Sequence, residues 1–554
     1  MTDLDQTLLS RHIARLLAPW NEAPGPGVAI GPGLTIGIAR GPNLILHQSA
    51  GLASIELAIP ITPQTTFRIA SVSKQFTCAA ILLLADEGRL SLDDDIRLHL
   101  PELADYGDTV TIDHLMHNSS GIRDMLEIMR IGGTDLAMPT SHQQLLDGIT
   151  RQQTLNFPPN SRYLYSNAGF LLLGLIAERT SGQKLRHFLA DRIFAPCGMS
   201  QTQMVESPTE LVPGLATGYL PADPTLAIGP WTRAQHGFAL HGEGALVSSI
   251  TDLALWARAC QTNRLGPNLT AQLEHCDMFT NPASGGGTNG HLNDYARGLR
   301  ISAVRGVRTV SHGGLWPGYK TEFLRIPELD TAIIVIANNA TANPYAIGQK
   351  ILHHLLDQVP GIKPAPTLPA PDILARHAGR FLDPKTPATV DFTLTPAGTL
   401  TYSTNGVAFE TRSNGDGRLA AANAGHDFTF RLSADGETID IELDAATTAT
   451  YQRITPGAGL PPDLPGTYRS EEMAATWTIG AHPIGMNLTI AGPHANAGPW
   501  PLEGIEGDIF RVWTPGALYR SWLDARLMRD AAGTVTGLLL NGNRVKNLAF
   551  QRTE

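Results

Sequence analysis

Cysteine is scarce in this sequence, and long apolar runs and an excess of positive charge are lacking. Four cysteines occur among 554 residues, and none lies in a CxxC pair, so the sequence indicates neither a zinc site nor a redox-active dithiol. We expect free, mostly buried thiols in a reducing cytoplasm; an extracellular protein with two disulfides is the alternative. No segment is long and apolar enough to predict a membrane span.

The overall charge is negative. A net charge of −10 and a pI near 6.0 argue against a general nucleic-acid-binding protein and give no sign of attraction to a membrane surface. The N-terminal stretch MTDLDQTLLSRHIARLLAPW starts acidic and lacks the apolar core of a signal peptide. Its leucine and isoleucine spacing predicts an amphipathic helix instead. We therefore expect a soluble cytoplasmic protein.

The length and the sequence patterns predict several domains, because one compact core rarely holds this many residues. Residues 1–360 mix strand-like and helical runs. LTIGIAR and LILHQSAGLAS read as a strand pair around the turn GPN, and TAIIVIANN reads as a buried strand. Long apolar helices are expected to begin near Ser71, Ala168 and Thr251. The pattern predicts a mixed α/β domain.

The composition changes at the proline-rich linker KPAPTLPAP, residues 363–371. Beyond it, hydrophobic residues alternate with polar ones, and the pairs Asn405-Gly406 and Asp435-Gly436 predict hairpin turns.

The tail contains two similar segments. Each opens with glycine, any residue and an aromatic, in AGRFLD and PGTYRS, and each closes with an aromatic, glutamine and arginine, in YQR and FQR. We interpret them as two antiparallel β-barrels over residues 372–455 and 464–554. A chance similarity between β-rich segments is the alternative.

The first candidate for chemistry is FRIASVSKQFTCAAILLL, where Ser71 and Lys74 share one helix face three residues apart. The helix is apolar on every side, so Lys74 is expected to be buried. Burial disfavours the ammonium and makes a neutral amine available beside a hydroxyl, which is the arrangement of a general base and a nucleophile. A second S-x-x-K, Ser181 to Lys184, lies in a polar context where Gly182 would end a helix; we interpret it as a surface turn.

Two further motifs could complete such a site. Tyr165-Ser166-Asn167 precedes an apolar helix; the phenol could relay a proton and the amide could orient its neighbours. The alternative is that Asn167 only caps the helix and Tyr165 only packs. His312-Gly313-Gly314 precedes strand-like residues, and its glycines allow close backbone approach to a ligand. A tight turn is the alternative here.

In this order, S-x-x-K, Y-x-N and H-x-G resemble the serine penicillin-recognising superfamily. A histidine in the third motif and the paired tail segments are similar to one branch, the bacterial D-aminopeptidase family. That resemblance implies a class C-type β-lactamase-like domain, in which helices and an all-helical subdomain flank an antiparallel sheet, followed by two antiparallel β-barrels. It also implies a homodimer that removes D-amino acids from the N-terminus of small peptides, amides and esters, without a metal or cofactor.

The resemblance implies a role for each catalytic motif residue. Ser71 would be the nucleophile and Lys74 its proton acceptor. Tyr165 would pass the proton to the leaving amine, and Asn167 would hold the substrate carbonyl or the lysine. His312 would replace the lysine that binds a substrate carboxylate in related enzymes, and a mostly neutral imidazole is a poor carboxylate anchor.

The resemblance also implies substrate-binding residues. Gly314 and Leu315 would border the oxyanion hole, with the backbone N–H groups of Ser71 and Leu315 as its donors. In the family a loop of the last barrel presents an aspartate to the substrate ammonium. The matching loop here, residues 511–526, would contribute Thr514, Pro515 and Gly516. Its tip, TPGALYRS, contains no carboxylate, and Asp524 falls in the following strand.

Other functions use the same residues. An esterase on this scaffold would need no carboxylate for an amino group. A β-lactamase or D,D-carboxypeptidase fits less well, because the third-motif lysine is missing and no export signal is present. A non-catalytic binding protein would have no need of Ser71, Lys74 and Tyr165 together.

Overall fold

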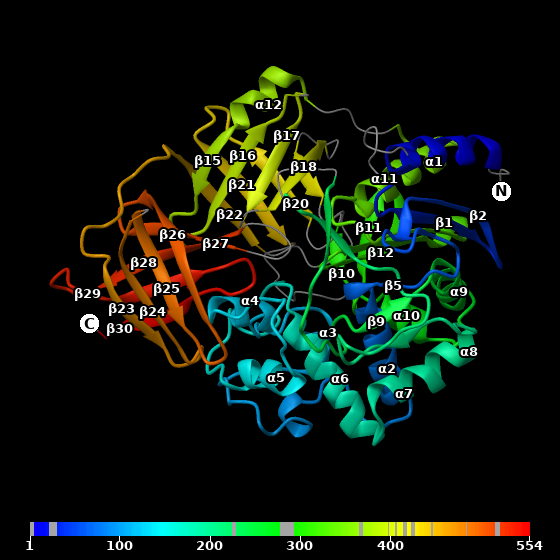
Figure 1. Ribbon diagram of the computed structural model, residues 1–554, viewed down its shortest axis with the longest axis horizontal. Helices are drawn as coiled ribbons and strands as arrows, with labels where there is room; N and C mark the ends of the chain where they lie inside the picture. Colours follow the sequence, from blue (N-terminus) through cyan, green and yellow to red (C-terminus); the bar gives the residue numbers. More distant parts are fainter. Residues whose placement is uncertain are drawn as a thin grey trace.

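The computed structural model describes residues 5–21, 30–223, 229–276, 293–364, 369–396, 398–404, 407–413, 418–422, 427–444, 447–483, 485–515 and 521–553. An α/β domain is followed by two eight-stranded β-barrels (Figure 1). This arrangement confirms the predicted multidomain fold. None of the helices in the described ranges combines the length and the apolarity that a bilayer crossing needs.

A seven-stranded antiparallel sheet forms the centre of the first domain. Its spatial order is β10 (Asn293–Tyr295), β11 (Arg300–Val304), β12 (Val307–Trp316), β13 (Tyr319–Ile326), β14 (Thr331–Ala337), β1 (Leu34–Arg40) and β2 (Asn43–Ala50). The predicted strand pair corresponds to β1 and β2, and the predicted buried strand is β14. Both predictions are confirmed.

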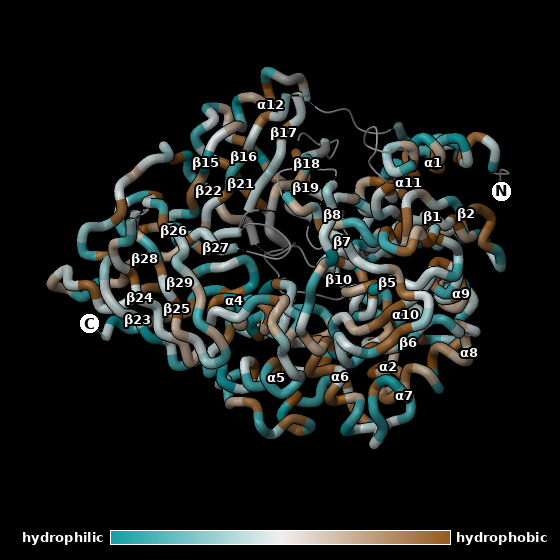
Figure 2. Tube along the Cα trace, viewed as in Figure 1, coloured by the Kyte–Doolittle hydropathy of each residue, from teal (hydrophilic) through white to brown (hydrophobic). Residues whose placement is uncertain are grey.

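Both faces of this sheet are covered, which explains why β14 is apolar without alternation. Ile333 and Val335 pack with α1 (Gln6–Asn21) and α11 (Pro344–Leu356) in one core. Ile334 and Ile336 point the other way, into the core that holds α9 (Ile250–Gln261). The α1 helix buries Leu9, Ile13 and Leu17, so the predicted amphipathic helix is confirmed. Figure 2 shows hydrophilic and hydrophobic residues side by side along it.

Most of the other described helices of this domain form a subdomain beside the sheet. They are η1 (Ala70–Ser73), α2 (Lys74–Asp86), η2 (Ile96–Leu98), α3 (Ile112–Met116), α4 (Met125–Ile131), α5 (His142–Thr150), α6 (Asn167–Ser181), α7 (Leu185–Leu189), the π-helix η3 (Ala190–Phe194), α8 (Ala195–Cys197) and α10 (Leu269–Leu273). The short 3₁₀ helix η5 (Pro327–Leu329) connects β13 to β14. Short strands join them: β3 (Leu52–Ser54), β4 (Ile59–Pro60), β5 (Phe67–Arg68), β6 (Gln203–Met204), β7 (Tyr219–Pro221), β8 (Trp231–Arg233) and β9 (Leu246–Ser248). Helices α2 and α6 are buried almost along their whole length.

Three cysteines of the first domain match the prediction of free thiols. Cys78, Cys197 and Cys260 are free thiols. Burial raises the pKa of Cys197 and of Cys260 to about 11, so both are unreactive thiols at neutral pH.

A short helix, α12 (Pro371–His377), leads into the first barrel. Its strands are β15 (Gly379–Leu382), β16 (Thr389–Leu394), β17 (Leu400–Thr404), β18 (Val407–Ser413), β19 (Leu419–Ala422), β20 (Asp427–Leu432), β21 (Thr438–Asp444) and β22 (Thr447–Ile454). The hairpin predicted at Asp435-Gly436 joins β20 to β21, and Gly436 adopts the left-handed φ of 82° that such a turn requires. The turn predicted at Asn405-Gly406 lies outside the described residues.

The second barrel repeats the first. Its strands are β23 (Gly466–Ser470), β24 (Ala475–His482), β25 (Gly485–Ala491), β26 (Asn496–Glu506), β27 (Ile509–Thr514), β28 (Ser521–Arg529), β29 (Val535–Asn541) and β30 (Leu548–Arg552). The repeated motifs meet where each barrel closes. Phe381 pairs with Arg453 in the first barrel, and Tyr468 pairs with Arg552 in the second. Each arginine also lies over its aromatic partner, with Cζ 4.6 and 5.8 Å from the ring centre.

The second barrel packs directly on the helical subdomain, beside α4 (Figure 1). Ile128 and Ile131 of α4 belong to the hydrophobic core of this barrel. Trp477 of β24 is fully buried, and its indole N–H donates to the Ile131 carbonyl at 3.1 Å. These contacts hold the second barrel against α4 of the first domain.

Candidate functional site

Ser71 lies in a short 3₁₀ turn between β5 and α2. The sequence predicted a helix beginning near Ser71; the structure has the turn Ala70–Ser73 first, and α2 begins at Lys74. Ala70 has a left-handed φ of 48°, an unfavourable conformation for a residue with a Cβ. Ala70, Val72 and Ser73 are buried, whereas Ser71 is partly exposed. The strained turn thus presents the Ser71 side chain to solvent.

Lys74 is fully buried and makes three contacts. Its Nζ lies 3.1 Å from Ser71 Oγ, 2.8 Å from Asn167 Oδ1 and 2.7 Å from the Glu243 carbonyl oxygen. Burial lowers the Lys74 pKa to about 7; the Glu243 and Asp124 carboxylates oppose this shift, and the Arg544 guanidinium adds to it. A substantial neutral fraction of the amine is therefore present at physiological pH.

Tyr165 lies on the other side of the serine. Its hydroxyl is hydrogen-bonded to Ser71, and the Lys74 nitrogen lies 4.8 Å from the centre of its ring. Burial raises the Tyr165 pKa far above its usual value, so the phenol carries its proton at neutral pH. Ser71, Lys74 and Tyr165 therefore form one contact group, as the motifs predicted.

Asn167 is the first residue of α6 and not its cap. The N-cap position belongs to Ser166, whose side chain makes no capping bond. The Asn167 side chain accepts from Lys74 and donates from Nδ2 to Asp124 Oδ2 at 2.8 Å, while its backbone N–H donates to the same oxygen at 2.7 Å. Asp124 thus accepts from the first backbone N–H of α6 and orients the side-chain amide of Asn167. The capping alternative for Asn167 is wrong.

Asp124 was not identified from the sequence as a site residue. It caps α4 through an Oδ1 contact with the Glu127 backbone N–H at 3.0 Å. The sequence signal was only that of an N-cap, an aspartate before an apolar helical run. Its second role depends on α6 lying against it, which local sequence does not reveal.

His312 lies on β12 and faces the tyrosines. Its Nδ1 lies 2.6 Å from the Gly313 carbonyl and must donate to it, so Nε2 is left to accept from the Tyr295 hydroxyl at 2.9 Å. Burial lowers the His312 pKa to about 3, and the positive charge on Lys74 adds to the shift. The imidazole is therefore neutral. Its ring centre is 6.2 Å from that of Tyr165.

Gly314 and Leu315 follow on the same strand, next to the Ser71 turn. A Cβ at Gly314 would lie 2.1 Å from the Ile69 carbonyl oxygen, so only glycine lets β12 approach the turn this closely. The Leu315 side chain is exposed. The strand that carries His312 is thereby held beside Ser71.

The residues that the resemblance implied for substrate binding in the last barrel differ in their exposure to solvent. Thr514 is buried, and its hydroxyl lies 2.8 Å from Ser521 Oγ and 3.3 Å from Arg130 Nη1. Pro515 is exposed. Gly516 lies outside the described residues. The Thr514 hydroxyl is thus hydrogen-bonded within the protein, to Ser521 and Arg130.

Asp524 belongs to β28, as the sequence predicted, and faces the junction of the two barrels. Its Oδ1 accepts from Arg511 Nε at 3.0 Å, and its Oδ2 accepts from the backbone N–H and hydroxyl of Thr389 at 3.0 and 2.7 Å. Both carboxylate oxygens of Asp524 therefore accept hydrogen bonds at the junction of the two barrels.

A loop of the second barrel reaches the site. The β29–β30 loop brings the Arg544 guanidinium over the Tyr165 ring, with Cζ 4.6 Å from its centre, and places Nη1 3.6 Å from Asp124 Oδ2. Arg544 follows Tyr165 by 379 residues in the sequence. No sequence motif marks it, and only the docking of the barrel on α4 brings it here.

The second S-x-x-K is a surface turn, as predicted. Ser181 ends α6, and Gly182 follows with a left-handed φ of 72°. The Lys184 side chain is 66% exposed and pairs with Glu178 at 3.1 Å. Lys184 therefore lacks the burial that distinguishes Lys74.

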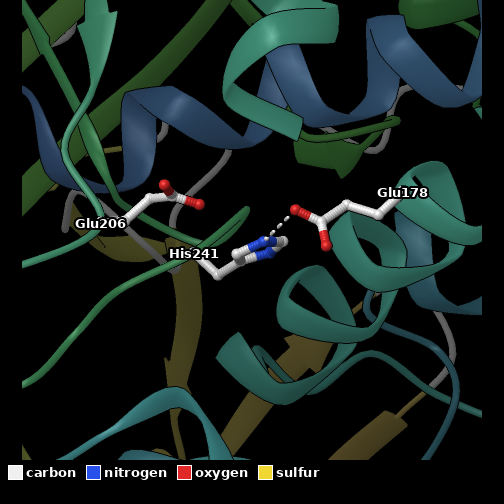
Figure 3. Close-up of side chains that lie close together, drawn as sticks. All are labelled: Glu178, Glu206 and His241. Carbon is white, nitrogen blue, oxygen red and sulfur yellow. Dashed lines mark hydrogen bonds and ion pairs between the residues drawn. The ribbon is translucent and has the colours of Figure 1, made fainter. Parts of the chain in front are cut away.

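One group of described residues has ligand atoms close enough to share a metal ion: Glu178, Glu206 and His241, with one atom of each within 4.8 Å of the others (Figure 3). His241 Nε2 lies 3.3 Å from Glu178 Oε1. Lys184 and Arg186 pair with the two carboxylates at 3.1 and 3.2 Å. Protein cations already balance this cluster, and we assign no metal to it.

Comparisons with known proteins point to one family. The Beta-lactamase family matches residues 26–358. A D-aminopeptidase of Cereibacter sphaeroides is 26% identical over 550 residues, which cover 95% of this chain and 97% of the relative. A D-aminopeptidase of Gluconobacter oxydans is 27% identical over 319 residues, 58% of each chain.

Solved structures share the fold. The octameric penicillin-binding protein homologue from Pyrococcus abyssi covers 81% of this chain and 100% of its own, with a TM-score of 0.56 and 22% identity. A D-stereospecific amidohydrolase from Streptomyces covers 62% of this chain and 99% of its own, with a TM-score of 0.50 and 19% identity.

Gly314→Ala should destabilise the protein, because the added Cβ would clash with the backbone oxygen of Ile69. We expect a loss of about 1–3 kcal/mol, measured by thermal unfolding. Gly480→Ala is the matched control, since a Cβ at this strand position of the second barrel meets nothing within 4 Å. Equal melting temperatures for Gly314→Ala and the wild type would contradict the close approach of β12.

Proposed function

Because this chain belongs to the Beta-lactamase family, we propose that it is a serine hydrolase that releases N-terminal D-amino acids from peptides, amides and esters. The observation that carries the proposal is the contact group at Ser71, whose hydroxyl meets both the buried Lys74 amine and the Tyr165 phenol. Similarity to D-aminopeptidases over nearly the full chain supports the D-stereospecific branch.

The first step would be attack by Ser71 on the substrate carbonyl carbon. A neutral Lys74 amine has two N–H groups and one lone pair. The N–H groups match the acceptors at Asn167 Oδ1 and the Glu243 carbonyl, which leaves the lone pair for the Ser71 proton at 3.1 Å. As the serine oxygen bonds to carbon, the proton moves to Lys74 and the carbonyl electrons move to its oxygen.

The tetrahedral oxyanion would be held by backbone N–H groups of Ser71 and Leu315. Ser71 lies in the 3₁₀ turn that precedes α2, and Leu315 lies on the strand that Gly314 brings close to this turn. One such donor contributes about 10²–10³ in rate. No metal or cofactor enters these steps.

Collapse of the intermediate would break the bond to the leaving nitrogen. Tyr165 is protonated at neutral pH and bonds to Ser71, so it can give its proton to that nitrogen and regain one from the Lys74 ammonium. Water then attacks the acyl-enzyme by the reverse route, which releases the D-amino acid and restores Ser71. His312, neutral and bonded to Tyr295, would shape the pocket beside Tyr165 without attracting a carboxylate.

An esterase is the second candidate, and one observation favours it. The tip of the β27–β28 loop, TPGALYRS, has no carboxylate for a substrate ammonium, and the nearby Asp524 is engaged at the barrel junction. The homodimer and the cytoplasmic location stay predictions; the similar Pyrococcus abyssi protein is described as octameric.

The stereoisomer assay separates the two candidates. We expect hydrolysis of D-alanine p-nitroanilide and no hydrolysis of the L-isomer, measured by nitroaniline release. Equal rates for both isomers, or turnover of a butyrate ester alone, would favour the esterase.

The two S-x-x-K motifs allow a matched test of the nucleophile. Ser71→Ala should abolish turnover, because it removes the attacking oxygen. Ser181→Ala should retain wild-type rates, because Ser181 ends α6 beside the exposed residues 182–184 and away from Lys74. Loss of activity in the Ser181 variant, with activity retained at position 71, would show that the other serine is the nucleophile.

The pH profile of kcat/KM should rise between about pH 6 and pH 8. The active form is the neutral Lys74 amine, whose pKa is about 7, so lowering the pH protonates it and removes the base. Tyr165 and His312 have pKa values far from neutrality and do not produce this limb. Lys74→Arg should be inactive at every pH, since its guanidinium keeps its proton. A flat profile across this range would contradict the assignment of Lys74 as the base.

A further inference from the structure

The β29–β30 loop is anchored rigidly to the catalytic domain. Glu127 of α4 accepts hydrogen bonds from the backbone N–H groups of Asn543, at 2.9 Å, and Arg544. Asn156 donates to the Arg544 carbonyl at 3.1 Å and accepts from the Lys546 N–H at 2.7 Å. The loop is therefore held on both sides of Arg544, which fixes the place from which this side chain enters the site.

Arg544 lies on the leaving-group side of the proposed reaction. Its guanidinium covers the ring of Tyr165, the residue that would protonate the leaving nitrogen. This step rests on the proposed function. In a substrate bound for attack by Ser71, the atoms beyond the scissile nitrogen must then pass close to Tyr165 and to the charge beside it.

The charges around Tyr165 differ in their accessibility. Its pKa responds to Arg544, Asp124 and Glu243, and Lys74 lies against its ring. Lys74, Asp124 and Glu243 are at most 2% exposed, whereas the Arg544 side chain is 28% exposed. A substrate entering from solvent therefore meets a positive charge at this end of the site. Asp124 offsets this charge only in part, because its Oδ2 already accepts two hydrogen bonds from Asn167.

We propose that Arg544 is a specificity residue that binds the carboxylate of the leaving amino acid, so that the preferred substrates are dipeptides with an N-terminal D-residue and a free C-terminus. The neutral His312 cannot provide such an anchor, and the cation supplied by the second barrel can. An arginine fork suits a carboxylate in geometry as well as in charge. Amides and anilides remain substrates but lack this contact.

The test compares D-alanyl-glycine with D-alanyl-glycinamide, which differ only in the carboxylate. We expect the wild type to favour the free acid in kcat/KM by about tenfold, the effect of one hydrogen bond to a charged group. Arg544→Met should bring the ratio close to 1, and Arg544→Lys should keep part of it. In the wild type the ratio should fall as salt is raised, because salt screens a partly exposed pair.

Arg469→Met is the matched control, because Arg469 is an arginine on the surface of the same barrel that pairs with Glu471; its ratio should equal that of the wild type. A wild-type ratio of 1, or an unchanged ratio in Arg544→Met, would overturn the proposal while D-alanine p-nitroanilide hydrolysis upholds the proposed function. Failure of the wild type on all three D-substrates would overturn both. If Arg544→Met does not fold, the reduced ratio expected for Arg544→Lys, together with the salt series on the wild type, tests the proposal.

Discussion

Burial of one amine is the constraint on which the site depends. Lys74 can remain inside an apolar helix pair only because three oxygens face it, from Ser71, Asn167 and the Glu243 backbone. The same burial lowers its pKa to about 7, so the feature that is unfavourable for folding makes a neutral amine available near neutral pH. Asp124 then becomes necessary, because it orients the Asn167 amide toward the lysine.

The second barrel is part of this site as much as the first domain is. Ile128 and Ile131 of α4 complete its core, and Glu127 fixes its β29–β30 loop. The loop brings a cation to Tyr165. The resemblance had implied an anion instead, on another loop, for the substrate ammonium. A docked loop of this kind adds a charge beside Tyr165 and leaves the contacts among Ser71, Lys74 and Asn167 in place.

The sequence predicted that Ser71, Lys74 and Tyr165 lie together because each motif has local meaning. The spacing of Ser71 and Lys74, together with an apolar helix, implied a buried amine without any tertiary information. The barrels were predicted from alternation and turn pairs, and their repeat was marked by the aromatic and arginine residues that meet at each closure. The N-cap alternative for Asn167 was wrong, because Asn167 is inside α6 and its backbone N–H donates to Asp124, which lies 43 residues away in the sequence.

What the sequence determined by itself is the chemistry of short segments: a buried lysine beside a serine, paired strands and a mostly neutral histidine. The tertiary structure alone decided which distant groups surround them. Tyr295 reaches His312 because β10 joins the sheet edge, and Arg544 reaches Tyr165 because a barrel packs on α4. Such contacts depend on how whole elements bury their apolar faces against one another, and this packing leaves no periodic or motif signal at the residues it brings together.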